Sequence, residues 1–416
     1  MRPLAAAVAG RHPVAPHRVD PPAGVARVPV SLPAMTNIGN ADPAPPLLMT
    51  PGPTRVPERV LRAGMRMLHH RTPEFSAVLD ETLQRLRLLY GTGSADILPI
   101  HGTGRAGTEA AVVNLFDPGD TVVACCNGKF SDMWAGFAVL YGLRVIRVAT
   151  DWEASVDPGE VAAALEAYPN ARAVTVVYSE TSTGALNPVP EIARVARARG
   201  ALTLVDTISA LGGTPFRFDA WGVDVAVTAS QKCLMSGPGL AFVALSSEAK
   251  AAAEAGGMPR SYLDFRSILR SVGRPRPETP GTAPVMLVLQ VREALRMIDE
   301  EGVDAVFERH RAMAARVRGW AEANGLGLSG RGILERSPTV TSVLLPPGVA
   351  AEAVRAGVRR RGIQIAAATG AHQASAVRIG HLGDIRMADV DRTLRARDDV
   401  LSAPGDDREA KGGGAP

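Results

Sequence analysis

The sequence contains few cysteines and few aromatic residues. Three cysteines occur among 416 residues; an odd number argues against a disulfide framework, and no pair has the spacing of metal ligands. The histidines form no metal-ligating set either, so we predict no bound metal. Aromatic residues make up only 4% of the chain, which argues against a surface on which nucleic-acid bases stack. Unpaired thiols are typical of a reducing compartment, and we expect a cytoplasmic protein.

Long apolar runs are also absent. No stretch approaches the roughly 18 uninterrupted apolar residues of a membrane-spanning helix, so we expect no contact with a membrane. The hydrophobic content of 46% still supports sizeable cores. Residues 1–46 and 403–416 show no sustained period, and their composition predicts a disordered leader and tail. The run at 4–9 is too short for a signal-peptide core, and Met35 remains an alternative start.

Positive charge is carried almost wholly by arginine. The net charge is +4 and the pI near 9.2, but the basic residues are scattered. Their one cluster, at 359–361, is typical of a solvated helix end, so we predict no nucleic-acid partner. Lysine occurs only at Lys129, Lys232, Lys250 and Lys411, and the rest of the 46 basic residues are arginine. A lysine directly after an apolar strand is therefore retained for its amine, because arginine cannot form an imine.

Two apolar β-rich runs, 201–205 and 223–229, each end in polar residues that can carry chemistry. Asp206 follows the first run, and Lys232 follows the second. Ligands of an open α/β sheet lie beyond the carboxyl ends of the strands, so these two side chains are expected to face one ligand. A lysine forms a Schiff base with an aldehyde such as that of pyridoxal phosphate, and a carboxylate keeps its ring nitrogen protonated. A helix cap for Asp206 and a surface charge for Lys232 remain alternatives at this point.

A glycine-rich loop at 102–107 follows a short apolar strand and precedes a helix. It matches the G-x-G-x-x-G pattern of nicotinamide dinucleotide folds. The next strand ends in Cys125, Cys126 and Asn127, without the acid that a ribose needs, which argues against an oxidoreductase. The backbone N–H groups at a helix start bind a single phosphate equally well, as pyridoxal phosphate requires.

The strings LVDTISALGGTP (204–215) and SQKCLMSGPGL (230–240) resemble the class V aminotransferases. These are pyridoxal-phosphate enzymes of fold type I, and the resemblance is to their alanine–glyoxylate and serine–pyruvate branch, from about Met49 to about Val400. It implies that Lys232 is the Schiff-base lysine and Asp206 the partner of the ring nitrogen.

The resemblance also implies the other contacts of the cofactor. Thr103, Gly104 and Arg105 match the phosphate loop, and Gln231 is assigned to the same site. Phe130 falls where the family places an aromatic that stacks on the ring, although periodicity alone fits an ordinary core position. Thr181 matches a hydroxyl that reaches the phenolic oxygen.

The same resemblance implies a substrate site and a shared interface. Gly52, in a TPGP segment along the mouth of the site, offers its backbone to the substrate, and Arg378 matches an arginine that clamps the substrate carboxylate. Thr282 matches a threonine that reaches the cofactor phosphate of a second subunit, which implies a homodimer. Thr279 stands where the family usually has tyrosine. Turn chemistry for the two threonines and a surface position for Arg378 are the alternatives.

Strands alternating with helices predict an α/β fold with a mainly parallel, wound sheet of seven-stranded type and a smaller C-terminal α+β domain. We expect an N-terminal segment at 47–70, a large cofactor-binding domain at 71–299 and a small domain at 300–402. The expected activity is amino-group transfer from a small amino acid, of alanine or serine type, to glyoxylate or pyruvate.

Other activities remain open from the sequence. Pyridoxamine–pyruvate or aminophosphonate transamination is the nearest alternative. A catalytically idle binding protein of the same fold is more remote, because such a protein is expected to have lost Lys232 or Asp206. A cysteine desulfurase is disfavoured, since no cysteine follows Cys233.

Overall fold

The computed structural model describes residues 45–152, 154–330 and 336–402. The predicted tail and all but the last two residues of the predicted leader lie outside the described residues. The chain divides after Ala44, and the account below concerns the unit that begins at Pro45.

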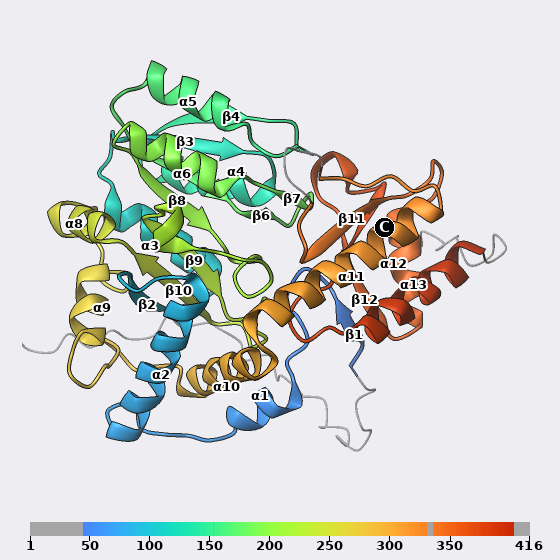
Figure 1. Ribbon diagram of the computed structural model, residues 1–416, viewed down its shortest axis with the longest axis horizontal. Coiled ribbons are helices and arrows are strands. Elements are labelled where there is room, and N and C mark those ends of the chain that lie inside the picture. The colour runs from blue at the N-terminus through green and yellow to red at the C-terminus, as the bar shows by residue number, and fades with distance from the viewer. Residues whose placement is uncertain (1–44, 153, 331–335, 403–416) are drawn as a thin grey trace, which may run out of the picture. The chain divides into compact units, whose positions relative to one another are not determined.

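A seven-stranded sheet forms the centre of this unit (Figure 1). Its spatial order is β2-β10-β9-β8-β5-β3-β4. Neighbouring strands run parallel except at β10, which is antiparallel to both β2 and β9. The predicted α/β fold with a mainly parallel seven-stranded sheet is therefore confirmed. The strands are β2 (Asp96–His101), β3 (Thr121–Cys126), β4 (Arg144–Ala149), β5 (Ala171–Val177), β8 (Leu202–Asp206), β9 (Val225–Ala229) and β10 (Leu240–Leu245).

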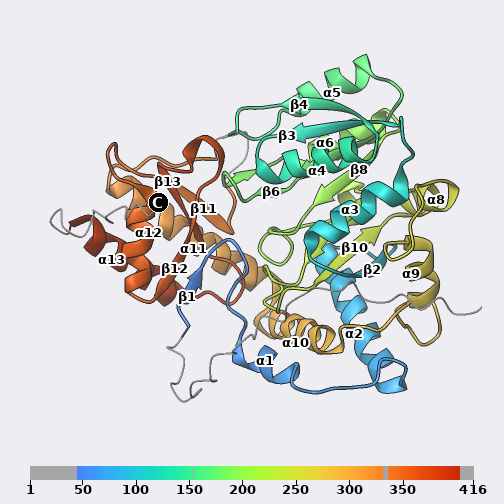
Figure 2. The ribbon, with the colours of Figure 1, turned by 180° about the vertical axis from the view of Figure 1, so that it is seen from behind.

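Helices cover both faces of the sheet, which Figures 1 and 2 view from opposite sides. Successive residues of β10 alternate between two hydrophobic clusters: Phe242 packs in the first, and Ala241 and Val243 in the second. Strands buried on both faces carry near-continuous apolar runs, as these do. The helices are α2 (Pro73–Tyr90), α3 (Gly104–Leu115), α4 (Lys129–Leu140), α5 (Pro158–Ala167), α6 (Val189–Ala198), α7 (Phe218–Trp221), α8 (Ser247–Ala255), α9 (Phe265–Val272) and α10 (Val285–Glu301).

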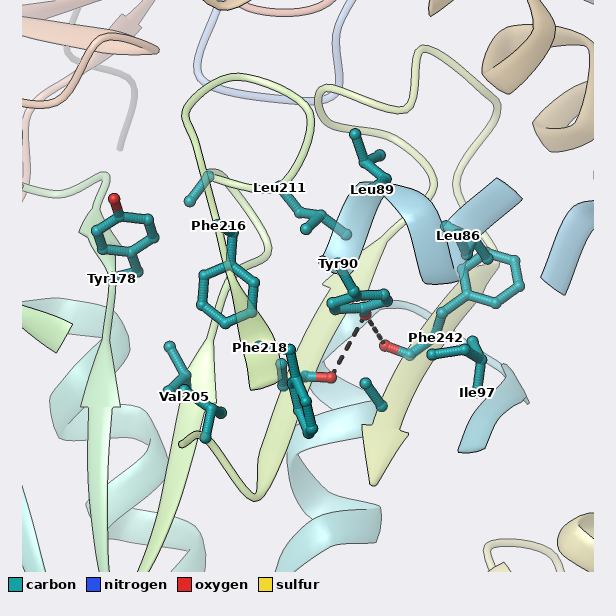
Figure 3. Close-up of a cluster of buried hydrophobic side chains, with 14 of the residues drawn as sticks. Leu86, Leu89, Tyr90, Ile97, Tyr178, Val205, Leu211, Phe216, Phe218 and Phe242 are labelled. Carbon is teal, nitrogen blue, oxygen red and sulfur yellow. Dashed lines mark hydrogen bonds between the residues drawn. The ribbon is translucent and has the colours of Figure 1, made fainter. Parts of the chain in front are cut away.

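Helix α2 is amphipathic, and most of its apolar residues are buried. Thr72 caps its start by accepting a hydrogen bond from the Phe75 N–H at 3.4 Å, and Gly91 ends it in the left-handed conformation. Figure 3 shows its buried face against the sheet. There the Tyr90 hydroxyl donates to the Phe242 carbonyl at 2.9 Å, so this phenol ties the helix to β10.

A second sheet has the order β1-β12-β13-β11 and is packed against three helices. Its edge strand β1 comes from the start of the described chain and runs parallel to β12, with Met49 opposite Ile365. Figures 1 and 2 both show this N-terminal strand beside the C-terminal ones. The elements are β1 (Leu47–Met49), β11 (Val340–Leu344), β12 (Ile363–Ala367), β13 (Ala376–Gly380), α11 (Val303–Ala323), α12 (Ala351–Arg360), η1 (Gly370–His372) and α13 (Met387–Ser402).

Short elements complete the described chain: α1 (Glu58–Ala63) and the two-residue strands β6 (Ser179–Glu180) and β7 (Ala185–Leu186). In the part of the chain that the structure describes, no helix combines the length and the apolar character that crossing a membrane requires. The predicted domain boundaries stay predictions.

Candidate active site

A cavity of about 440 Å³ opens at the carboxyl ends of the parallel strands. This volume is within the range of small-molecule sites. Its position is the one expected for a ligand of an open α/β sheet. The residues that line it are Gly52, Pro53, Thr103, Gly104, Arg105, Phe130, Met133, Val177, Ser179, Thr181, Asp206, Ile208, Ser209, Gln231, Lys232 and Pro238.

The cavity brings together every sequence-predicted site residue except Thr279, Thr282 and Arg378. The Thr279 hydroxyl is buried and donates to the Gly281 carbonyl at 2.7 Å, as a turn residue does. Thr282 lines a different cavity, beside Met67 and Pro284. The predicted contact of Thr282 with a second subunit is not tested by a single chain.

Asp206 ends β8 with its side chain 4% exposed. Its Oδ1 accepts a hydrogen bond from the Ile208 N–H at 2.8 Å, so the capping bond considered from sequence is present as well. Burial raises the pKa of this carboxyl to about 7, the Ile208 N–H opposes that rise, the charge of Glu180 adds to it, and that of Lys232 opposes it. The carboxyl therefore takes up and releases a proton near neutral pH.

Lys232 follows β9, and its ammonium donates a hydrogen bond to the Pro51 carbonyl. Desolvation lowers the pKa of this amine to about 8, although the charge of Asp206 works against the change. About a tenth of the amine is therefore neutral at pH 7, far more than for an ordinary lysine, and only a neutral amine attacks a carbonyl. Gly52 makes room for the side chain, since a Cβ at that position would lie closer than 3.0 Å to Lys232.

The start of α3 borders the opposite side of the cavity. Thr103 is its N-cap residue and makes no side-chain capping bond. Gly104 packs so tightly that a Cβ would lie closer than 3.0 Å to the Ile208 side chain. The Arg105 guanidinium lies over the Phe137 ring, 5.1 Å from its centroid. A helix start beside a cationic side chain favours an anion such as a phosphate.

These groups fit pyridoxal phosphate. The Gln231 Oε1 is buried and has no hydrogen-bond partner within the described residues. Because an amide can turn to present its NH₂ instead, this side chain can donate to a ligand in the cavity. The helix start suits the phosphate, Lys232 the aldehyde and Asp206 the ring nitrogen.

Arg378, on β13, lies next to this cavity rather than on its wall. Its Nη1 donates to the Thr181 carbonyl and its Nε to the Ala367 carbonyl, both at 2.7 Å. Burial lowers the pKa of the guanidinium, and the charge of Glu180 opposes that change. The two backbone carbonyls orient the planar group and join β13 to the loop that carries Thr181.

Sequence reasoning missed Glu180. The loop after β5 was considered only for Thr181, yet Glu180 is completely buried and accepts four hydrogen bonds. The available signal was an acid three residues after a buried strand, close to the strand's carboxyl end. When such an acid is buried, it almost always has hydrogen-bond partners.

Across residues 45–152, 154–330 and 336–402, no three or more His, Cys, Asp and Glu side chains lie so as to hold a metal ion. Cys125, Cys126 and Cys233 are buried free thiols.

Comparison with known proteins places these residues in a family context. The sequence profile described as aminotransferase class V matches residues 48–395. The chain is 36% identical over 365 residues to the small subunit of a soluble hydrogenase from Synechococcus sp., covering 86% of this chain and 94% of that one. It is 34% identical to the L-aspartate–glyoxylate aminotransferase of Paracoccus denitrificans, covering 82% and 87% of the two chains.

A solved structure shows the same architecture. The alanine–glyoxylate aminotransferase from Nostoc sp. superposes with a TM-score of 0.82 at 32% identity, over 88% of this chain and 97% of that one. The fold of the described chain is thus that of an aminotransferase structure.

Proposed function

The chain belongs to the class V aminotransferases, and we propose that it moves an amino group from a small amino acid to glyoxylate or pyruvate through a Schiff base at Lys232. As a member of this family it is a transferase of fold type I whose cofactor is pyridoxal 5′-phosphate. The names of the Paracoccus and Nostoc relatives favour glyoxylate as the acceptor.

One observation carries the proposal: Lys232 and Asp206 line a single cavity from the ends of neighbouring strands. The amine has a lowered pKa and the carboxyl a raised one, both mainly because of burial. Groups with pKa values shifted toward neutrality and gathered in a cleft are typical of catalytic sites.

Pyridoxal phosphate, when bound, supplies an aldehyde that takes up amines and a ring that delocalises negative charge. Lys232 would hold that aldehyde through Nζ. Once free, the neutral Nζ would take up the proton that leaves the substrate Cα. Asp206 holds a proton on the ring nitrogen.

The remaining groups bind and orient. The start of α3 with Thr103, Gly104 and Arg105, together with Gln231, binds the phosphate, while Phe130 packs on the ring. Thr181 donates to the phenolic oxygen. These assignments are proposals from the family resemblance and the shared cavity.

We place the substrate between Gly52 and Arg378. The backbone of Gly52 borders the cavity, and the Arg378 guanidinium, oriented by its two backbone acceptors, offers bidentate geometry to a carboxylate. A small amino acid with one carboxylate matches the Arg378 guanidinium.

The proposal includes a cytoplasmic homodimer. Thr282 lies outside the cavity of its own chain, as a residue that serves a second subunit would. Thr279 lacks the aromatic ring that usually stands at its position, so its part in a cross-subunit contact rests on the hydroxyl alone. Both contacts, the dimer and the location stay predictions.

A spectral half-reaction screen tests the reaction. The loaded protein is mixed with alanine, serine or aspartate alone, and its visible cofactor band is followed before glyoxylate or pyruvate is added. We expect one amino acid to bleach the band and one 2-oxo acid to restore it. If pyridoxamine with pyruvate turns over while no amino acid bleaches the band, the substrate assignment is wrong.

The lysine assignment has its own test. Lys232→Ala is expected to abolish both transamination and the adduct that borohydride fixes to the protein, because no other amine takes its place. Lys250→Ala is the matched control. Lys250 forms an ion pair with Asp96 at 3.1 Å, and Asp96 lies at the opposite end of the strands from the cavity. Turnover by the Lys232 variant at the rate of the control would contradict the assignment.

A further inference from the structure

The buried carboxylate of Glu180 joins two walls of the cavity. Its Oε2 accepts hydrogen bonds from the N–H groups of Phe130 at 3.1 Å and Ser131 at 3.0 Å. Its Oε1 accepts from the Ser182 N–H at 3.0 Å and the Ser182 hydroxyl at 2.6 Å. The first pair belongs to α4 and the second to the loop after β6, so one side chain bridges two elements.

Helix α4 depends on this carboxylate for its N-terminal cap. Its own N-cap residue is Gly128, which has no side-chain oxygen to accept from the first N–H groups. Glu180 accepts two of them, and the Ser182 hydroxyl accepts a third, from Lys129, at 3.0 Å. A negative group is also favourable at this end of the helix dipole.

The packing leaves no room for a substitute. A Cβ at Gly128 would lie closer than 3.0 Å to Glu180 and to the Ser182 hydroxyl. At Gly128 the backbone therefore lies so close to the carboxylate that only glycine fits there. The position of the helix start follows from that contact.

Both bridged elements present predicted cofactor contacts to the cavity. Phe130 comes from α4, and Thr181 comes from the loop. The loop is also held from the other side, because Arg378 donates to the Thr181 carbonyl. Glu180 thus bridges the two walls, and its hydrogen bonds hold them at a defined distance from each other.

We propose that Glu180 is a positioning residue whose single carboxylate sets the distance between Phe130 and Thr181 and so orients the cofactor ring. The inference rests on the proposed function, because it takes both side chains as ring contacts. It assigns Glu180 no contact with the cofactor itself.

The charge of Glu180 also affects Asp206, the proposed partner of the ring nitrogen. Burial raises its pKa, while hydrogen bonds from Ser182 and from backbone N–H groups favour the ionised form. Burial is the main cause of the raised pKa of Asp206, the Ile208 N–H opposes the rise, and the charge of Glu180 adds to it. Loss of Glu180 should therefore disturb Asp206 as well as the two walls of the cavity.

Two variants test the proposal. Glu180→Gln keeps the shape but turns one acceptor into a donor that faces N–H groups. Ser182→Ala removes the hydroxyl that links Lys129 to Glu180 with little change in volume, and it serves as the test if the first variant does not fold.

Asp224→Asn is the matched control. Asp224 is also a buried carboxylate, accepting from the Thr203 N–H at 2.8 Å and the Ser246 hydroxyl at 2.9 Å. It lies at the other ends of the strands, before β9, and does not line the cavity. It therefore reports what losing a buried carboxylate does to stability alone.

The measurements are the dissociation constant of pyridoxal phosphate, the visible circular dichroism of the bound cofactor and the thermal unfolding of the cofactor-free protein. We expect Glu180→Gln to weaken the binding of pyridoxal phosphate about tenfold and to diminish the dichroism. The reason is that the loss of one acceptor disturbs the whole network of hydrogen bonds around Glu180. Ser182→Ala should do the same to a smaller extent. Asp224→Asn should lower the unfolding temperature and leave binding and dichroism unchanged.

The outcomes separate two failures. If Glu180→Gln binds the cofactor with wild-type affinity and dichroism, or if Asp224→Asn changes them equally, Glu180 is a stability residue and the inference is wrong. If the wild-type protein itself binds no pyridoxal phosphate, the proposed function fails instead.

Discussion

At the scale of single residues, the site depends on two groups whose proton affinities are moved by burial. Asp206 is buried at a strand end, and Lys232 is desolvated beside it. Each opposes the shift of the other through its charge. The consequence is that both groups change protonation close to neutral pH, where the proposed proton transfers take place.

Asp206→Asn tests the acid. An amide still accepts the Ile208 N–H bond, so the fold is expected to survive, but it cannot hold a proton on the ring nitrogen. We expect the transamination rate to fall by a factor of about 100 or more with little change in cofactor affinity. Stopped-flow absorbance of the half-reaction measures both, and an unchanged rate would show that the acid serves only as a cap.

In the cofactor-free protein, Asp206→Asn should also change how stability depends on pH. The folded pKa of Asp206 is raised to about 7 from the usual 3.8, so its contribution to stability is present below the usual pKa and is lost as the pH rises through 7. Relative to wild type, Asp206→Asn should therefore gain roughly 2 to 3 kcal/mol between pH 5 and pH 8. Urea unfolding at the two pH values measures the gap.

At the scale of elements, the segment after β1 reaches Lys232. The Pro51 carbonyl accepts the hydrogen bond of Lys232, and the Thr54 N–H donates to the Gln231 carbonyl at 3.1 Å. The Thr54 hydroxyl donates to the Leu382 carbonyl at 2.9 Å. This segment therefore contacts both the residues around Lys232 and the chain after β13.

Gly52→Ala tests that contact. A methyl group would occupy the space of the Lys232 side chain, and the φ of +118° already disfavours any residue but glycine. Because the lysine can swing aside, we expect a folded protein whose affinity for pyridoxal phosphate falls more than about tenfold.

Gly119→Ala is its control. Gly119 has a φ of +92° but no atom within 4 Å of an added Cβ. It should lose about 1 kcal/mol of stability and bind the cofactor as wild type does. Equal cofactor affinity in the two variants would show that the contact with Lys232 is unimportant.

At the scale of the whole molecule, a buried histidine makes stability depend on pH. The Nδ1 of His310, on α11, lies 2.7 Å from the Val306 carbonyl, and its Nε2 accepts from the Gly383 N–H at 3.1 Å. A second proton on Nε2 would face that N–H. Burial accordingly lowers the pKa of His310 to about 4.

His310→Gln should reveal this effect. The histidine contributes stability above its usual pKa of 6.5 and loses it as the pH falls toward 4. At pH 7 the variant should be less stable than wild type. This deficit in unfolding free energy should shrink by about 2 to 3 kcal/mol at pH 4.5. A constant deficit in urea unfolding would contradict the prediction.

The sequence by itself determined the local elements and the order in which they follow. Apolar runs at 201–205 and 223–229 became β8 and β9, with shifts of only one or two residues at their starts. Asp206 and Lys232 could be placed at one site because parallel strands end at the same edge of a sheet. Periodicity and strand ends are local properties, which neighbouring residues largely decide.

Only the tertiary structure decided the contacts between distant segments. The pairing of β1 with β12, the contact of Gly52 with Lys232 and the bond from Arg378 to Thr181 join residues far apart in sequence. The role of Glu180 belongs with them, since an acid after a strand gives no sign of which helix start it will cap. Such contacts depend on how elements pack, and packing is a property of the whole fold rather than of any one stretch of sequence.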